Sequence, residues 1–394
     1  MNLSENLAVG PGDLVAVALP PGPEWLPIVR DLWEAGASVL PVDHRLTSAE
    51  TRAILGRARP TVVVDAAGAM VYTEGARIDP SVGVCLATSG TVGEPKVVEL
   101  SRDAVEAAVR CSIEALDGHE DDPWLCCLPL AHAGGMLVLL RGVVAGAPVE
   151  ILRRFDLDAV AASPHVFTAL VPTMVHRLLA DGVDLSHFRA VLVGGAELDD
   201  ATGEHAREAG ARLVSTYGLT ETAGGVAYDG VLFDGTAARF GPHGEIQIAG
   251  PTVMEGYRFD PQATAEAFTL DGYVRTGDAG ELGEDGRLLV HGRLDDLILS
   301  GAEKIWPQEV EAALREHPDV IDVAVAGRPD PDWGARVIAF VVPEPDRPTP
   351  TVQELRDFAS DRIARFKAPR DIVLVEELPR TPSGKLRRGL LPIP

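Results

Sequence analysis

The first two hundred residues alternate short apolar runs with amphipathic stretches of helical length, and this rhythm constrains the fold most strongly. The pattern predicts a buried strand over Asp13 to Leu19, a helix over Pro23 to Ala35 and a strand over Ala37 to Pro41. A second helix is expected over Thr47 to Ala58, where Thr47 and Glu50 have the spacing of a capping box. Strands and helices that alternate in this way predict a parallel sheet covered by helices.

The pattern changes twice in the second half of the chain. From about Gly241, polar and apolar residues alternate as in antiparallel strands that have one solvated face. After Arg293 to Asp296, predicted strands and helices make a compact α+β unit of about a hundred residues. We therefore expect an α/β fold: a large N-terminal domain of parallel-sheet layers over residues 1–292, a β-rich subdomain within it at about 240–292, and a small C-terminal α+β domain over 297–394.

The segment from Leu86 to Lys96 contains three hydroxyl side chains, two glycines and a lysine between two apolar runs. Glycine lets backbone N–H groups approach an anion, and hydroxyl and ammonium groups donate to phosphate oxygens. The lysine does not directly follow the second glycine, so the segment is not a Walker loop. It predicts a phosphate-binding loop between two strands, although an ordinary hairpin turn would use the same residue types.

Composition excludes several kinds of protein. A formal net charge of −24 argues against binding to nucleic acid or to anionic membranes. The four cysteines have no metal-ligand spacing and do not suggest a disulfide framework. The N-terminus lacks the features of a signal peptide, and no apolar run is long enough to span a bilayer, so we expect a cytoplasmic protein. A metal hydrolase would need ligand spacing, and a serine hydrolase a G-x-S-x-G turn, that the sequence lacks.

Four later motifs accompany the phosphate-loop segment: residues 216–222 (TYGLTET), 275–278 (RTGD), 292–296 (GRLDD) and 379–385 (PRTPSGK). Each motif alone is compatible with packing or with a common turn. In this order, over about three hundred residues, they resemble the adenylate-forming superfamily of acyl-CoA synthetases, adenylation domains and luciferases. The resemblance implies two reactions in one site. A carboxylate first attacks the α-phosphate of ATP, and a thiol then displaces AMP after the mobile C-terminal domain rotates about a hinge at 293–296.

The resemblance also implies roles for particular residues. For the nucleotide, it implies a phosphate loop of Thr88, Ser89, Gly90, Thr91 and Lys96, an adenine wall that includes Gly195, Ala196 and Tyr217, a ribose site at Asp278 and Arg293, and α-phosphate and Mg²⁺ contacts at Thr220 and Glu221. For the acyl group and CoA, it implies a pocket that includes His132, Gly194, Gly218, Ser300 and Gly301. Asp295 would be the hinge. Lys385 would stabilise the charge that develops during adenylation, so that Lys96, Thr220, Glu221 and Lys385 form the catalytic set.

Within the superfamily, residues 217–230 and 232–235 resemble the o-succinylbenzoate–CoA ligases of menaquinone biosynthesis. The resemblance implies a small carboxylic acid, ATP, Mg²⁺ and CoA as ligands, and leaves a homodimer open. Another aryl or short acyl acid is an alternative substrate, because Ala131 and Ala302 depart from the pattern of many relatives. Two further hypotheses are an adenylation enzyme that loads a carrier protein instead of CoA, and a non-catalytic binding module. The presence of Glu221, Asp278 and Lys385 argues against the binding module.

Overall fold

The computed structural model describes residues 9–72, 74–88, 95–301, 303–380 and 386–392. Packing density divides the chain into two compact units. The first unit comprises Met1–Ala238 and Ile248–Arg275, and the second comprises Arg239–Gln247 and Thr276–Pro394. None of the helices in the described ranges combines the length and the apolar character that crossing a bilayer requires.

Two seven-stranded sheets form the framework of the first unit. The first sheet has the order β16-β6-β5-β2-β1-β3-β4. Its strands are β1 (Leu14–Val17), β2 (Ser38–Pro41), β3 (Val62–Asp65), β4 (Gly68–Val71), β5 (Val82–Thr88), β6 (Lys96–Ser101) and β16 (Gly256–Tyr257). The central pairs β1–β2, β1–β3 and β2–β5 are parallel, as predicted, whereas β4, β6 and β16 join the edges in antiparallel pairs.

The second sheet repeats this plan with the order β13-β12-β11-β10-β9-β7-β8. Its strands are β7 (Trp124–Cys126), β8 (Val149–Ile151), β9 (Phe167–Leu170), β10 (Ala190–Val193), β11 (Leu213–Leu219), β12 (Gly224–Tyr228) and β13 (Val231–Leu232). The strands from β8 to β11 are parallel, and β12 and β13 extend the sheet in antiparallel pairs. Each sheet therefore has a parallel centre and at least one antiparallel edge.

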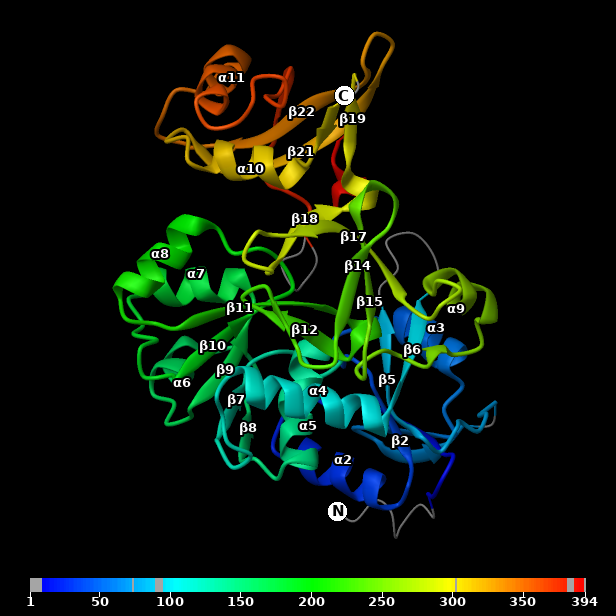
Figure 1. Ribbon diagram of the computed structural model, residues 1–394. Helices are drawn as coiled ribbons and strands as arrows, with labels where there is room; N and C mark the ends of the chain where they lie inside the picture. The colour runs from blue at the N-terminus through cyan, green and yellow to red at the C-terminus, as the bar shows by residue number, and fades with distance from the viewer. Residues whose placement is uncertain (1–8, 73, 89–94, 302, 381–385, 393–394) are drawn as a thin grey trace. The chain divides into compact units, whose positions relative to one another are not determined.

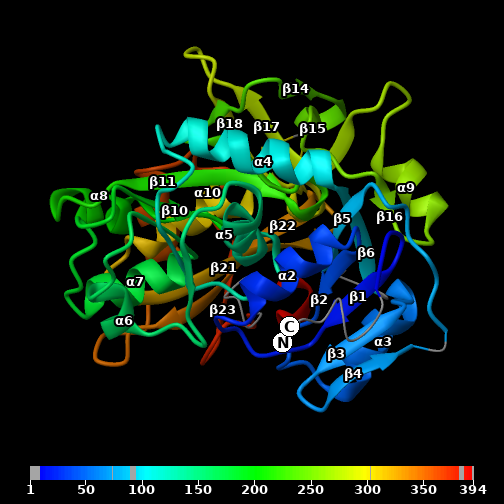
Figure 2. The same cartoon turned by 90° about the horizontal axis from the view of Figure 1, so that it is seen from below.

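Within the first unit, helices and sheets alternate in five layers, which Figures 1 and 2 show from two sides. One hydrophobic core joins the facing sides of the two sheets through α2 (Trp25–Glu34), α4 (Arg102–Ala115) and α5 (Ala133–Val144). A second core packs α3 (Ser48–Ala58) on the outer face of the first sheet. A third packs α6 (Leu157–Ala161), α7 (Pro172–Ala180) and α8 (Asp200–Glu208) on the outer face of the second. The strands are apolar on both faces because helices cover both faces.

A four-stranded sheet has the order β14-β15-β17-β18, with β17 and β18 antiparallel, and belongs largely to the second unit. Its strands are β14 (Ala237–Phe240), β15 (Glu245–Ala249), β17 (Val274–Leu282) and β18 (Leu288–Arg293). The short helix α9 (Pro261–Ala267) lies between β16 and β17 in the chain. Antiparallel pairing is thus present in this part of the chain, between β17 and β18, and the predicted bounds of the β-rich subdomain stay a prediction.

The rest of the second unit has its own core. It contains the hairpin β19 (Ile298–Ser300) and β20 (Glu303–Ile305), and a sheet of β21 (Val320–Asp330), β22 (Gly334–Pro343) and β23 (Asp371–Leu374). Alternate residues of β21 and β22 point to opposite faces. One face packs under α10 (Pro307–Arg315) and α11 (Val352–Ser360). The other face packs against Leu378, Leu386 and Leu391 of the C-terminal segment. The hinge expected at 293–296 lies inside this unit and stays a prediction, because packing density does not report a rotation axis.

Candidate active site

The predicted phosphate loop connects an antiparallel hairpin, as its sequence indicates. Thr88 ends β5 and pairs directly with Lys96, the first residue of β6. The Thr88 hydroxyl lies 3.5 Å from the carbonyl oxygen of Lys96. Ser89, Gly90 and Thr91 lie outside the described residues. The hairpin therefore fixes both ends of the loop and places Thr88 and Lys96 side by side.

Tyr257 connects Lys96 with Glu221, two residues that come from distant parts of the sequence. The Lys96 ammonium lies 4.7 Å from the centre of the Tyr257 ring, and the Tyr257 hydroxyl donates a 2.8 Å hydrogen bond to Oε1 of Glu221. β16 carries Tyr257 into the sheet edge beside β6, where it pairs with Val98. The structure thus brings two of the predicted catalytic residues to one tyrosine that the sequence analysis missed. The Met254 N–H donates to the Glu221 carbonyl, three residues before Tyr257. This contact, which brings Tyr257 close to Glu221, could be recognised only in the folded chain.

A tight turn between β11 and β12 presents Thr220 and Glu221. Both residues lie in a single 3₁₀ turn, Thr220–Thr222, and Ala223 follows in the left-handed region with φ of 50°. The buried Thr222 hydroxyl accepts the Leu219 N–H at 3.0 Å and lies 2.9 Å from the Gly224 carbonyl oxygen. A Cβ atom at Gly218 would lie 1.8 Å from the same carbonyl. The strands can therefore close this turn only around a glycine.

The predicted adenine wall follows β10 at the carboxyl end of the second sheet, where parallel α/β sheets commonly bind ligands. A Cβ atom at Gly194 would lie 2.2 Å from the Thr216 hydroxyl, and Gly195 has a φ of 84°. Tyr217 lies next to Thr216 on β11 and is half-buried. Ala196 lines a cavity of about 290 Å³ between the end of β10 and the start of α8. The pairing of Val193 with Ser215 brings the ends of β10 and β11 together, and the adenine role of these residues stays a prediction.

His132 is the N-cap residue of α5 and makes no capping hydrogen bond with its side chain. The surrounding protein lowers the pKa of its imidazole through desolvation, while Asp43 raises it and Arg45 lowers it. Part of the residue nevertheless stays exposed to solvent. The loop from Asp43 to Arg45, held by the Asp43–Arg45 ion pair, thus faces the predicted acyl gate.

In the second unit, Asp278 and Arg293 form an ion pair. They are paired residues on β17 and β18, and Nη1 of Arg293 lies 3.1 Å from Oδ1 of Asp278. The same nitrogen donates to the Thr276 carbonyl at 3.1 Å. Gly277 between them has a φ of 67°, and a Cβ atom there would lie 3.0 Å from the guanidinium. The structure therefore brings together the two residues that the sequence assigned to a ribose.

The remaining predicted residues lie further along the second unit. Asp295 lies exposed in the 3₁₀ turn Leu294–Asp296 that follows β18. Ser300 is buried at the end of β19, and Gly301 has a φ of 61° with its N–H bound to the Trp333 carbonyl at 2.7 Å. Lys385 lies outside the described residues, in the segment 381–385 between Arg380 and Leu386. The roles of these residues stay predictions.

The donor set fits a magnesium ion that enters with a nucleotide. Within the described ranges, no group of three or more His, Cys, Asp or Glu side chains could hold a metal ion on its own. Mg²⁺ prefers one or two carboxylates together with substrate phosphates and water. Glu221 offers one half-buried carboxylate, oriented by the Tyr257 hydroxyl and close to the start of β6.

The fold and this arrangement of residues define a class of protein. The family model described as "AMP-binding enzyme" matches residues 2–86 and 81–240, and the model "AMP-binding enzyme C-terminal domain" matches residues 309–385. The chain belongs to the AMP-binding enzyme family, and the predicted membership in the adenylate-forming superfamily is confirmed.

Several curated relatives are similar over most of their length. A probable 2-succinylbenzoate–CoA ligase from Mycobacterium tuberculosis is 36% identical over 371 residues, which cover 91% of this chain and 95% of that protein. The 2-succinylbenzoate–CoA ligase of Listeria monocytogenes is 33% identical over 92% of this chain and 85% of its own. An indoleacetate–CoA ligase from Aromatoleum aromaticum is 37% identical over 79% of this chain and 68% of its own.

Solved structures agree with the fold. The o-succinylbenzoate CoA synthetase (MenE) of Bacillus subtilis in complex with the acyl-adenylate OSB-AMP has a TM-score of 0.86 and 26% identity, covering 99% of this chain and 90% of that one. The same enzyme with ATP and a magnesium ion also gives 0.86 at 26% identity, with 99% and 91% covered. The predicted α/β fold with a small C-terminal domain is thereby confirmed.

Proposed function

We propose that this chain is an AMP-forming acid–CoA ligase, and that its acid is o-succinylbenzoate. The observation that carries the proposal is the contact of Lys96 and Glu221 through Tyr257, beside a phosphate-loop hairpin in a chain of the AMP-binding enzyme family. The choice of acid is supported by relatives of matching length, one of which is aligned over 95% of its sequence.

In the first step, a carboxylate oxygen of the acid attacks the α-phosphorus of ATP, and the bond to pyrophosphate breaks. Lys96 and the hydroxyls of the phosphate loop would hold the leaving phosphates, and Lys385 would stabilise the charge that grows on the reacting oxygens. Mg²⁺, when bound beside Glu221, neutralises phosphate charge. Glu221 is held for this role by the Tyr257 hydroxyl.

In the second step, the sulfur of CoA attacks the acyl carbonyl, the acyl–phosphate bond breaks, and AMP leaves with the electron pair while the thiol proton goes to solvent. Asp278 would hold the ribose hydroxyls of the nucleotide, since a carboxylate can accept two hydrogen bonds. Its ion pair with Arg293 orients it. Ser300 and Gly301 would line the path of the thiol.

One experiment tests the reaction class and the acid together. Purified protein with MgATP and single acids from a panel that includes o-succinylbenzoate, indoleacetate and malonate should release pyrophosphate only with acid, fastest with o-succinylbenzoate. Mass spectrometry with CoA should then find the acyl-CoA and AMP. Preference for indoleacetate would favour another aryl-CoA ligase, as the similarity to an indoleacetate–CoA ligase allows. Formation of ADP and orthophosphate would contradict the proposal.

A second experiment tests the predicted catalytic lysine. Lys385→Ala should slow adenylate formation by about 100-fold or more, because its charge acts on the transition state of that step. The variant should still convert a supplied acyl-adenylate and CoA at close to the wild-type rate. Arg347→Ala is the matched control, because Arg347 is an exposed cation paired at 3.5 Å with Asp319. Equal loss of both half-reactions in Lys385→Ala would contradict a separate role for the lysine.

We also infer a cytoplasmic setting, in which ATP and CoA are available and thiols stay reduced. All four cysteines are free and buried, which is compatible with that setting. Whether the chain forms a homodimer is testable by sedimentation, and the proposed chemistry needs only one copy.

A further inference from the structure

Glu311 on α10 is a buried carboxylate that the proposed reaction does not use. Only 2% of the residue is exposed. One oxygen accepts the backbone N–H of Val325 on β21 at 2.7 Å, and the other lies 3.4 Å from a guanidinium nitrogen of Arg315, one turn along the helix. A buried charge is tolerated when it is paired and hydrogen-bonded. Glu311 therefore needs a further cation close to its carboxylate.

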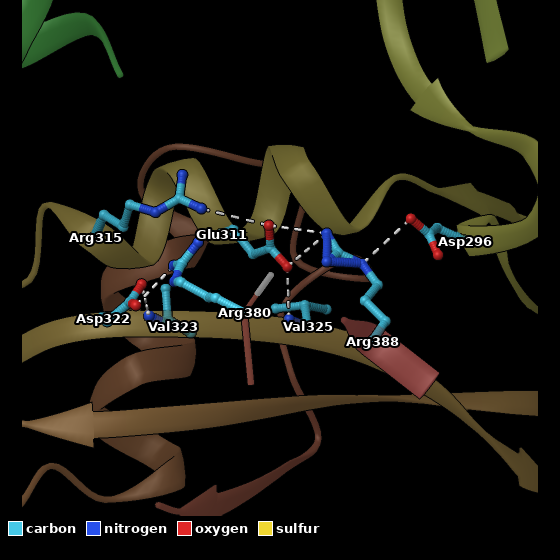
Figure 3. Close-up of polar contacts among 8 residues, drawn as sticks. All are labelled: Asp296, Glu311, Arg315, Asp322, Val323, Val325, Arg380 and Arg388. Carbon is cyan, nitrogen blue, oxygen red and sulfur yellow. Dashed lines mark hydrogen bonds and ion pairs between the residues drawn. The ribbon is translucent and has the colours of Figure 1, made fainter. Parts of the chain in front are cut away.

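That cation comes from the C-terminal segment. Nη2 of Arg388 lies 2.8 and 3.0 Å from the two carboxylate oxygens of Glu311. Nε of Arg388 lies 3.4 Å from Asp296, without a hydrogen bond. Figure 3 shows Arg388 between Glu311 and Asp296, with Arg315 on the far side of Glu311. Burial raises the pKa of Glu311, and among the contacts that lower it, Arg388 contributes most.

Arg388 follows a short closed loop whose described ends are paired. Arg380 and Leu386 form an antiparallel bridge, and the Arg387 N–H donates to the Pro379 carbonyl at 2.8 Å. Lys385 lies within this loop, three residues before Arg388. The position of Arg388 therefore sets where one end of the loop leaves the domain.

Apolar contacts alone do not fix that position. Leu378 and Leu391 are buried against the face of β21 and β22 opposite α10, which attaches the segment to the domain. Apolar burial is non-directional, whereas a guanidinium bound to both oxygens of one carboxylate defines an orientation. A second polar contact of this segment, between Arg380 and Asp322 at 2.7 Å, is about a third exposed, and ion pairs with this exposure contribute little. The Arg328 guanidinium also donates to the Pro392 carbonyl at 3.0 Å, at an exposed site.

We propose that the Glu311–Arg388 ion pair is a positioning device that holds the loop carrying Lys385 in the orientation needed for adenylate formation. The functional part of this proposal rests on the proposed function, in which Lys385 acts in the first step only. The structural part rests on the contacts of Glu311, Arg388, Asp296 and Val325 alone.

The test uses full-length variants. Glu311→Gln keeps an oxygen for the Val325 N–H but removes the charge, and Arg388→Met removes the cation. The double variant leaves no unpaired buried charge, and Arg388→Lys keeps the cation. Arg315→Met is the matched control, because it removes a cation from the same carboxylate without altering the C-terminal segment.

We expect Glu311→Gln, Arg388→Met and the double variant to lower kcat for acid-dependent pyrophosphate exchange by about 10- to 100-fold, because small displacements of a catalytic group have effects of this size. KM for ATP and acid should change little, since the contact of Lys385 with the reacting groups is expected to act in the transition state. Conversion of a supplied acyl-adenylate should stay within about twofold of wild type. Arg388→Lys should recover part of the activity. Full recovery in the double variant would show that the defect came from an unpaired buried charge, and would overturn the proposal.

Hydrogen exchange separates this proposal from the proposed function. The amides of Arg387, Leu390 and Leu391 are hydrogen-bonded, and they should exchange at least about tenfold faster in Glu311→Gln and Arg388→Met than in Arg315→Met. Unchanged exchange in both variants would overturn the proposal, whether or not any acid is found. If Lys385→Ala abolishes adenylation while Glu311→Gln and Arg388→Met retain it, the function holds and the positioning role fails.

Discussion

Tyr257 shows how one side chain can serve two predicted catalytic residues. Its ring lies against the Lys96 ammonium, and its hydroxyl binds the Glu221 carboxylate. A cation over an aromatic face is stabilised by about 0.5–2 kcal/mol, and a hydrogen bond to a charged group by about 1.5–3 kcal/mol. The hydrogen bond to Glu221 is the stronger of these two interactions, so the hydroxyl should matter more than the ring.

Tyr257→Phe tests that difference. The substitution keeps the ring beside Lys96 and removes only the donor to Glu221, so kcat for pyrophosphate exchange should fall about tenfold. Higher Mg²⁺ should restore part of the loss if Glu221 holds the ion. Tyr72→Phe removes a phenol elsewhere in the first unit and serves as the control. Activity within twofold of wild type would show that Glu221 needs no orientation by Tyr257.

Sequence motifs predicted site residues that carry recognisable chemistry, and they gave no sign of residues that contact these from distant parts of the chain. Lys96, Glu221, Asp278 and Arg293 stand in local patterns of hydroxyl, glycine and charge. Tyr257 has no such pattern around it, and only the pairing of β16 with β6 brings it to the site. Glu311 looks like any acidic residue of an amphipathic helix, and its partner Arg388 lies 77 residues away. Long-range pairing of this kind cannot be read from periodicity.

At the scale of elements, glycines set how closely strands approach around the site. Gly218 shows the strongest case, since a side chain there would meet backbone atoms of Gly224 and Gly225. Backbone cannot move aside as the end of a flexible side chain can. Even a methyl group at position 218 should therefore force β11 and β12 apart.

Gly218→Ala should lower stability by about 3 kcal/mol or more, because overpacking against backbone forces the strands apart. The midpoint of thermal unfolding should fall by roughly 5–10 °C. Gly56→Ala is the control, because Gly56 lies in helix α3 with no atom near the added methyl group. It should raise stability by about 0.5–1 kcal/mol. A Gly218→Ala protein as stable as wild type would contradict the close approach of β11 and β12.

Elements with strong local signals were predicted well. The capping box at Thr47 is present, with the Glu50 carboxylate accepting the Thr47 N–H at 2.8 Å. The strand predicted over Ala37 to Pro41 is present as β2, Ser38–Pro41. The edge strand β4 was not predicted, because its short sequence Gly-Ala-Met-Val has neither a clear alternation nor a β-branched run. The edge strand β16 depends on pairing with β6, which lies far away in the sequence.

At the scale of the whole molecule, the reactivity of the cysteines measures how well the hydrophobic cores exclude solvent. All four are free and buried, and burial raises the pKa of Cys126 and Cys127 to about 12 and raises that of Cys85 and Cys111. Thiols react as thiolates, so burial and a raised pKa both protect them. They lie in the layered cores of the first unit.

The native protein should therefore react only slowly with a thiol reagent at pH 8, and four thiols should react after unfolding in guanidinium. The sign of the pH dependence follows from the same pKa values. A thiol ionises near pH 9 in the unfolded chain but near pH 12 when folded, so its contribution to stability is complete below pH 9 and is lost as the pH rises toward 12. Rapid reaction of one or more native thiols would show that a core opens locally.

The two edges of the first sheet differ, and the difference affects how the protein behaves at high concentration. At one end, the two residues of β16 cover the open side of the β6 hairpin. At the other end, β4 is the last strand in the order, and Met70 and Val71 are 52% and 72% exposed. An edge strand with exposed apolar side chains can pair with a strand of another protein molecule. When the protein is concentrated or stored, we expect aggregation to begin at strand β4. The substitution Val71→Lys should delay this aggregation.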